Sequence, residues 1–154
     1  MTPDQQAAWD RYCAETGDTR QPYDVFAFGD SPALADELLA LVLAGTKQAT
    51  ASRLHLYKKL QMRPPAPGDL SLILDGQERP AGVIETGQVE IAPFNTATTE
   101  FAWAEGEGDR SLDHWHAAHL TYFHRECAGE GSFFSEDEPI VFERFRLIWT
   151  LQNR

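Results

Sequence analysis

The sequence is short of basic residues and of cysteines, and it has no long hydrophobic run. Its 13 Lys and Arg face 24 Asp and Glu, a formal net charge of −11, which excludes a protein that binds double-stranded DNA through its overall charge. The two cysteines, Cys13 and Cys127, provide neither a disulfide framework nor a zinc-finger spacing. The longest apolar run, residues 38–44, is far shorter than the roughly 20 residues of a membrane-spanning helix. We expect a soluble, cytoplasmic protein with no membrane partner.

The composition that is present is typical of a globular protein. The 154 residues, 42% hydrophobic and 24% charged, fit a single domain over residues 1–154. Cap and proline signals predict a helix over about 3–16 and a second one that begins at Ser31-Pro32 and ends at Gly45. Apolar spacing and turn residues predict the other elements: a helical stretch ending at about Gln61, strands at 70–74, 81–85, 88–91 and 140–151, a short helix at 99–104, and a helix after Ser111. This order predicts an α+β fold, a small barrel with helices packed at its ends.

The basic residues are concentrated in one segment. Residues 47–63 contain five of them and no acid: Lys47, Arg53, Lys58, Lys59 and Arg63. Subtracting this +5 from −11 leaves −16 on the other 137 residues. A cationic strip on an acidic protein is typical of a local anion-binding site. A solvated helix face would have the same composition.

Two further features carry possible chemistry. Lys47 and Thr50 are spaced i, i+3, which places them on one side of a helical turn but on opposite faces of a strand. A lysine beside a threonine can activate the hydroxyl or hold an anion, and it can equally be a solvated helix start. The acidic loop Glu105-Gly106-Glu107-Gly108-Asp109 can supply a general base, bind a hard cation, favour a helix N-terminus or form salt bridges with the basic strip.

Four histidines, residues 114, 116, 119 and 124, lie in the predicted helix after Ser111. His116 and His119 share a side of that helix. No HExxH motif or Cys/His cluster accompanies them, so we interpret them as polar helix residues and assign no metal ligand.

Together these segments resemble an ASCH-domain protein of the longer bacterial type, in the PUA-like superfamily. The resemblance covers about residues 9–148 and rests on these motifs in this order: Phe28-Gly29-Asp30, Ala35-Asp36-Glu37-Leu38 with Leu41-Val42, Gly45 to Thr50, Pro67-Gly68-Asp69, residues 104–109 with Ser111-Leu112, Trp115 and His119, and Glu143-Arg144-Phe145. It implies a PUA-like small β-barrel with surrounding helices. It also implies a cleft that recognises RNA or a modified nucleoside.

The resemblance implies two alternative activities. Some family members resemble ribonucleases that act on single-stranded RNA with a divalent metal, Mn or Mg. A shorter branch consists of amidohydrolases that remove acetyl from N4-acetylcytidine with a Lys-x-x-Thr motif and a glutamate, which match Lys47, Thr50 and Glu107 here. The short branch has an arginine five positions after its lysine; that position is Ser52 here, and Arg53 follows it. Other members are domains of transcription coactivators, and for these the resemblance implies a module that only binds.

We therefore predict an RNA-directed protein, a ribonuclease acting on single-stranded RNA, with an amidohydrolase or a non-catalytic RNA-binding module as alternatives. Lys47, Thr50 and Glu107 are the candidate catalytic residues, and in the amidohydrolase Thr50 attacks while Lys47 accepts its proton. The candidate substrate-binding residues are Arg53, Lys58, Glu105 and Asp109. We assign no certain cofactor; a divalent metal, Mn or Mg, goes with the ribonuclease alternative. The partner is short single-stranded RNA or a modified nucleoside, contacted over few phosphates because most of the chain is acidic.

Overall fold

The computed structural model describes residues 1–151 and has an α+β fold built on one curled sheet. Five strands form a half-barrel in the order β1-β3-β4-β5-β2: β1 (Asp24–Ala27), β2 (Ala49–Arg53), β3 (Leu70–Leu74), β4 (Pro80–Pro93) and β5 (Pro139–Thr150). Only β1 and β3 pair in parallel; the other pairs are antiparallel. The expected α+β class and the barrel-like sheet with helices around it are confirmed.

Five α-helices surround the sheet, α1 (Pro3–Thr16), α2 (Pro32–Leu43), α3 (Leu54–Lys59), α4 (Thr99–Glu105) and α5 (Leu112–Gly129), with a short 3-10 turn η1 (Phe94–Thr96). The cap signals operate as predicted. Thr2 and Gln5 form a capping box on α1, and the hydroxyls of Ser31 and Ser111 cap α2 and α5. No helix among residues 1–151 is long and apolar enough to cross a membrane.

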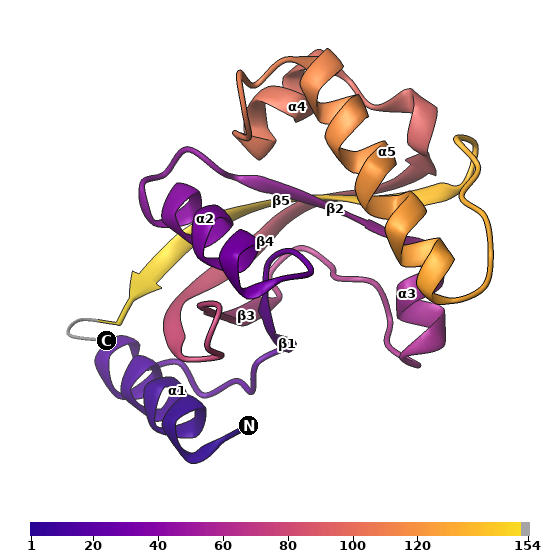
Figure 1. Cartoon of the computed structure of the whole chain (residues 1–154). Coiled ribbons are helices and arrows are strands. Elements are labelled where there is room, and N and C mark those ends of the chain that lie inside the picture. The colour runs from indigo at the N-terminus through magenta and orange to yellow at the C-terminus, as the bar shows by residue number, and fades with distance from the viewer. Residues whose placement is uncertain (152–154) are drawn as a thin grey trace.

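Three apolar clusters bind the helices to the sheet. One packs α4 and α5 on β2 and β5 around Phe94 and Trp115, one packs α2 around Phe28 and Phe145, and one packs α1 around Trp9. Figure 1 shows the result: α4 and α5 lie together at one end of the sheet, and α1 lies at the other end. Because α2 and α5 are anchored in separate clusters, the space between them is not filled by a common core.

Two predicted elements differ from the structure. The helical stretch expected to end at Gln61 is strand β2 followed by the six-residue α3; β2 forms because β5 offers it a complete antiparallel register. The strands expected at 81–85 and 88–91 are one strand, β4, whose pairing with β5 shifts by one residue between Thr86 and Val89. This bulge adds an unpaired residue and interrupts the alternation of side chains along β4. The sequence pattern therefore predicted two strands, one on each side of the bulge.

Candidate functional site

A cavity of about 510 Å³ lies beside the sheet where α2, α3 and α5 approach β1 and β2. This volume is within the ~300–1,000 Å³ of small-molecule sites. Its walls are mostly aromatic and aliphatic, and its polar side chains come from several segments that lie far apart in the chain. The main lining residues are Tyr23, Asp24, Phe26, Phe28, Leu34, Leu38, Lys47, Thr50, Ser52, Leu56, Tyr57, Ser71, Glu105, Glu107, His119, Tyr122, Phe123, Arg125, Glu126 and Glu143.

Lys47 is the centre of the polar end of this cavity. Lys47 is only 2% exposed. Its ammonium Nζ lies 2.8 Å from Glu105 Oε1, 3.0 Å from Glu107 Oε2 and 2.8 Å from the carbonyl oxygen of Ala49. These three acceptors match the three donors of an ammonium group. Lys47 is therefore fixed by residues that lie nearly 60 positions away in the chain.

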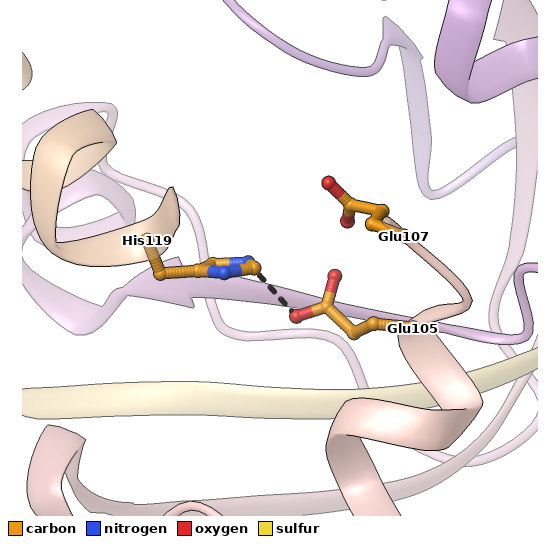
Figure 2. A group of neighbouring side chains, drawn as sticks. All are labelled: Glu105, Glu107 and His119. Carbon is orange, nitrogen blue, oxygen red and sulfur yellow. Dashed lines mark ion pairs between the residues drawn. The ribbon is translucent and has the colours of Figure 1, made fainter. Parts of the chain in front are cut away.

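Glu105 joins Lys47 to α5. Its second oxygen, Oε2, accepts a hydrogen bond from Trp115 Nε1 at 2.6 Å and lies 2.9 Å from His119 Nε2. The other ring nitrogen of His119, Nδ1, lies 2.9 Å from the carbonyl oxygen of Trp115, which can only accept. Both contacts favour the protonated ring: burial alone would lower the pKa of His119, but the charge of Glu105 outweighs it and raises that pKa. Figure 2 shows this pair, with Glu107 on the loop beyond α4 next to it.

A glycine makes the arrangement of Glu105 and Glu107 possible. Gly106 ends α4 with φ of +73°, and a Cβ at this position would lie 2.4 Å from the carbonyl oxygen of Thr46. The backbone of the acidic loop therefore passes directly against the segment that carries Lys47. This contact brings the two carboxylates to the lysine.

The electrostatics assign different protonation states to the members of this cluster. Burial alone would lower the pKa of Lys47, but the charges of Glu105 and Glu107 outweigh it and raise that pKa, so Lys47 is charged at neutral pH. Burial opposes the charge of Glu105 too, but His119 and Lys47 hold its pKa well below the usual range. Burial raises the pKa of Glu107, and the attraction of Lys47 does not fully offset it. Glu107 is therefore the group able to exchange a proton.

Thr50 lines the same cavity from β2. It follows Ala49, whose carbonyl oxygen accepts a hydrogen bond from Lys47, and it pairs with Glu143 of β5. Lys47 precedes the strand, so the opposite-face rule for i, i+3 residues on a strand does not separate the two side chains. The Thr50 hydroxyl makes no hydrogen bond within residues 1–151. It is a free hydroxyl on the wall of a cavity that Lys47, Glu105 and Glu107 also line.

Glu105, Glu107 and His119 could in principle hold a divalent metal, because one ligand atom of each lies within 4.8 Å of the others. The charged Lys47 already contacts both carboxylates, and His119 Nε2 lies against Glu105 Oε2. A divalent cation bound through His119 Nε2 would have to displace the proton from it and would stand beside the ammonium of Lys47. The residues present do not fit a metal in this arrangement.

Three of the predicted substrate-binding residues lie away from the cavity lining. Arg53 is 4% exposed and points to the other side of β2, where it pairs with Glu126 at 3.2 Å and Glu130 at 3.3 Å and also with Glu138. Lys58 is exposed on α3, and Asp109 is exposed and caps the backbone of Ser111 at 2.9 Å. Of the predicted binding residues, only Glu105 lines the cavity together with Lys47, Thr50 and Glu107.

The cationic strip is largely neutralised. Lys47 and Arg53 are paired as described, Lys59 lies 3.6 Å from Glu130, and Arg63 lies 2.7 Å from Asp69. The segment contains no acid in sequence, but the fold brings acids to it from elsewhere. The strip is therefore not a free anion-binding surface.

Sequence reasoning missed two lining residues and undervalued a third. Glu143 and Asp24 face the cavity, and His119 was grouped with polar helix histidines although it is buried against Glu105. A signal existed for Glu143: the alternation of β5 places it on the face of Val141 and Phe145, so it is a carboxyl in an apolar series. Nothing comparable marks Asp24.

Known proteins resemble this chain over nearly its whole length. A protein of family DUF984 from Enterococcus faecalis V583 has 34% sequence identity and a TM-score of 0.88, with 97% of this chain and 91% of that one covered. An ASCH domain from Lactobacillus crispatus JV V101 has 28% identity and a TM-score of 0.87, with 97% and 96% covered. No curated protein matches the sequence. The ASCH domain family model matches residues 24–149, and the chain therefore belongs to the ASCH domain family.

Proposed function

We propose that this protein is an RNA-directed hydrolase that removes the acyl group from an N-acylated nucleobase, with N4-acetylcytidine as the type substrate. Membership of the ASCH family supports an RNA-binding role. The observation that carries the finer proposal is that Lys47, Thr50 and Glu107, which match the short amidohydrolase branch, all line one cavity of about 510 Å³. Aromatic walls and this volume suit a planar base with its sugar.

The protonation states give each residue a role. Thr50 is the nucleophile, because its hydroxyl is free. Lys47 is a charged ammonium, so it stabilises the negative charge that develops on the acyl oxygen and does not accept the Thr50 proton. Glu107, whose pKa burial raises, accepts that proton. Glu105 holds Lys47 and His119 in place.

The reaction then balances in two halves. The Thr50 oxygen attacks the acyl carbon while its proton passes to Glu107; the C–N bond breaks, and the nitrogen takes the proton from Glu107 to leave the amine. Water then attacks the threonyl ester, giving its proton to Glu107, and the carboxylic acid departs as the Thr50 hydroxyl recovers that proton. Such a covalent route replaces one difficult step by two easier ones.

A ribonuclease is less well supported by the charges. Three cationic side chains line the cavity, and each already has an acidic partner: Lys47 with Glu105 and Glu107, His119 with Glu105, and Arg125 with Asp30 at 2.9 Å. A phosphodiester would have to compete with these carboxylates. An uncharged base meets no such opposition. A non-catalytic module that captures a base in the same cavity uses the same contacts.

One set of incubations tests the proposal. The protein is incubated with N4-acetylcytidine, and cytidine and acetate are measured by chromatography; single-stranded RNA is incubated in parallel with Mn²⁺ and with chelator. Thr50→Val should lose at least about 100-fold in kcat, Thr50→Ser should retain part of the activity, and Thr121→Val, on the exposed face of α5, should be unchanged. If N4-acetylcytidine stays intact while the protein still binds RNA, the amidohydrolase is refuted and the non-catalytic binding module is supported. If RNA is cleaved and the cleavage requires Lys47, the ribonuclease is supported.

A further inference from the structure

Glu143 is a buried carboxyl on the wall of the cavity, apart from the lysine cluster. It lies on β5, opposite Thr50 of β2 in the antiparallel register, and is 8% exposed. Residues opposite each other in such a pair point to the same side, with Cβ atoms about 4.5–5.5 Å apart. The Glu143 side chain therefore stands beside the free hydroxyl of Thr50, and both line the cavity.

Only one of its two carboxyl oxygens is occupied. Glu143 Oε2 accepts a hydrogen bond of 2.7 Å from the hydroxyl of Thr86, which the bulge in β4 brings across the sheet. Oε1 has no partner within residues 1–151, and no Lys, Arg or His in this part of the chain pairs with the group. Because every fully enclosed side-chain oxygen there has a hydrogen-bond partner, Oε1 keeps contact with the open space of the cavity.

The surroundings of Glu143 are acidic and aromatic. Asp24 of β1 and Asp69 before β3 act on it electrostatically, and Tyr57 of α3 lies within range of its charge. The hydroxyl of Thr86 donates to it, and Thr50 stands opposite it on β2. A ligand atom that accepts hydrogen bonds is unfavourable beside these carboxyls, whereas an N–H donor on a planar ring flanked by Phe26 and Tyr57 is favourable.

We propose that Glu143 is a specificity-determining residue that accepts a hydrogen bond from an exocyclic N–H of a nucleobase bound in the cavity. The inference rests on the proposed function, since it uses the same cavity, and adds a recognition group on the strand next to the nucleophile. Burial raises the pKa of Glu143 to about 7, and the hydrogen bond from Thr86 offsets only part of this. Ligand binding through the carboxylate should therefore strengthen as the pH rises through this value.

Binding of two nucleosides to the whole protein tests this without relying on turnover. Cytidine carries an exocyclic N–H, and N4,N4-dimethylcytidine does not; their dissociation constants are measured by calorimetry at pH 6 and pH 8. At pH 8 we expect cytidine to bind at least about tenfold more tightly than N4,N4-dimethylcytidine. At pH 6 we expect this preference for cytidine to be smaller. Glu143→Gln should lose most of the preference and its pH dependence, whereas Glu37→Gln, an exposed carboxyl on α2, should keep both.

The outcomes separate the two proposals. An equal preference in Glu143→Gln and the unchanged protein, or no binding of either nucleoside, overturns the role of Glu143. A preference that depends on Glu143 while N4-acetylcytidine stays intact supports this inference and refutes the proposed amidohydrolase. Turnover of N4-acetylcytidine at the same KM in Glu143→Gln refutes the inference alone.

Discussion

Replacing Glu143 by glutamine should make the protein more stable at alkaline pH. The carboxyl is buried beside other acids and its pKa is raised to about 7, above the ~4.3 of an unfolded glutamate. Between these two values the folded chain binds more protons than the unfolded chain, so the group lowers the free energy of unfolding as the pH rises. Glutamine keeps an oxygen to accept the Thr86 hydrogen bond and carries no charge.

The size of the effect follows from the two pKa values. At 1.36 kcal/mol per pKa unit, the raised pKa of Glu143 lowers the free energy of unfolding by about 3.5 kcal/mol at pH 8 and by about 1 kcal/mol at pH 5. Glu143→Gln should gain this much relative to the unchanged protein at each pH. Urea denaturation of both proteins at pH 5 and pH 8 measures it, with Glu37→Gln as the matched control that should show no gain.

The reasoning fails if the gain is the same at both pH values, or if the substitution destabilises the protein at pH 8. The first result would mean that Glu143 is not the titrating group. The second would mean that a partner fixes its ionised form. A gain at pH 8 together with the loss of nucleoside selectivity would identify Glu143 as a residue kept for binding at the expense of stability.

Three other perturbations have defined outcomes. Arg53→Met leaves the carboxylates around it uncompensated and should lower the free energy of unfolding by about 3 kcal/mol or more, but nucleoside affinity should change less than twofold because Arg53 lies outside the cavity; thermal denaturation and calorimetry check the two halves. Gly106→Ala must strain a φ of +73° and press on Thr46, so it should cost about 1–3 kcal/mol and should abolish hydrolysis by moving Glu107 from Lys47. RNA affinity should fall gently with salt, with a slope of roughly −0.7 per phosphate contacted on a single strand; a filter-binding slope that implies eight or more phosphates would contradict the neutralised strip.

The local signals in the sequence predicted most of the helices. Thr2-Pro3, Ser31-Pro32 and Ser111 mark helix starts because a side-chain cap is a contact between near neighbours. The segment 49–53 has no comparable signal. Its conformation is decided by β5, some 90 residues away, with which it pairs along its whole length. A prediction from residues 46–61 alone therefore favoured a helix.

The candidate site divides in the same way. Lys47, Thr50 and Glu107 could be named as candidates because residue type and spacing carry over from a family motif, and the glycine between the two glutamates marked a shaped loop. The position of Arg53 was not predictable in this way, because its three acidic partners come from α5 and the segment before β5. In the sequence, Glu143 stands out only as a charged residue among alternating apolar residues. That its Oε1 has no hydrogen-bond partner within residues 1–151 depends on the fold.

The distribution of charge has the same origin. In the sequence, five basic residues without an acid suggest a site for phosphate. In the fold, the acids that neutralise them come from the end of α4 and the loop after it, from α5 and the residue after it, and from the segment before β3. The groups that face the cavity include a lysine whose charge is already balanced, a free hydroxyl and a carboxyl with one free oxygen. These groups suit an uncharged ring with a polar edge, so the ligand is selected by its hydrogen bonds rather than by the charge of its phosphates.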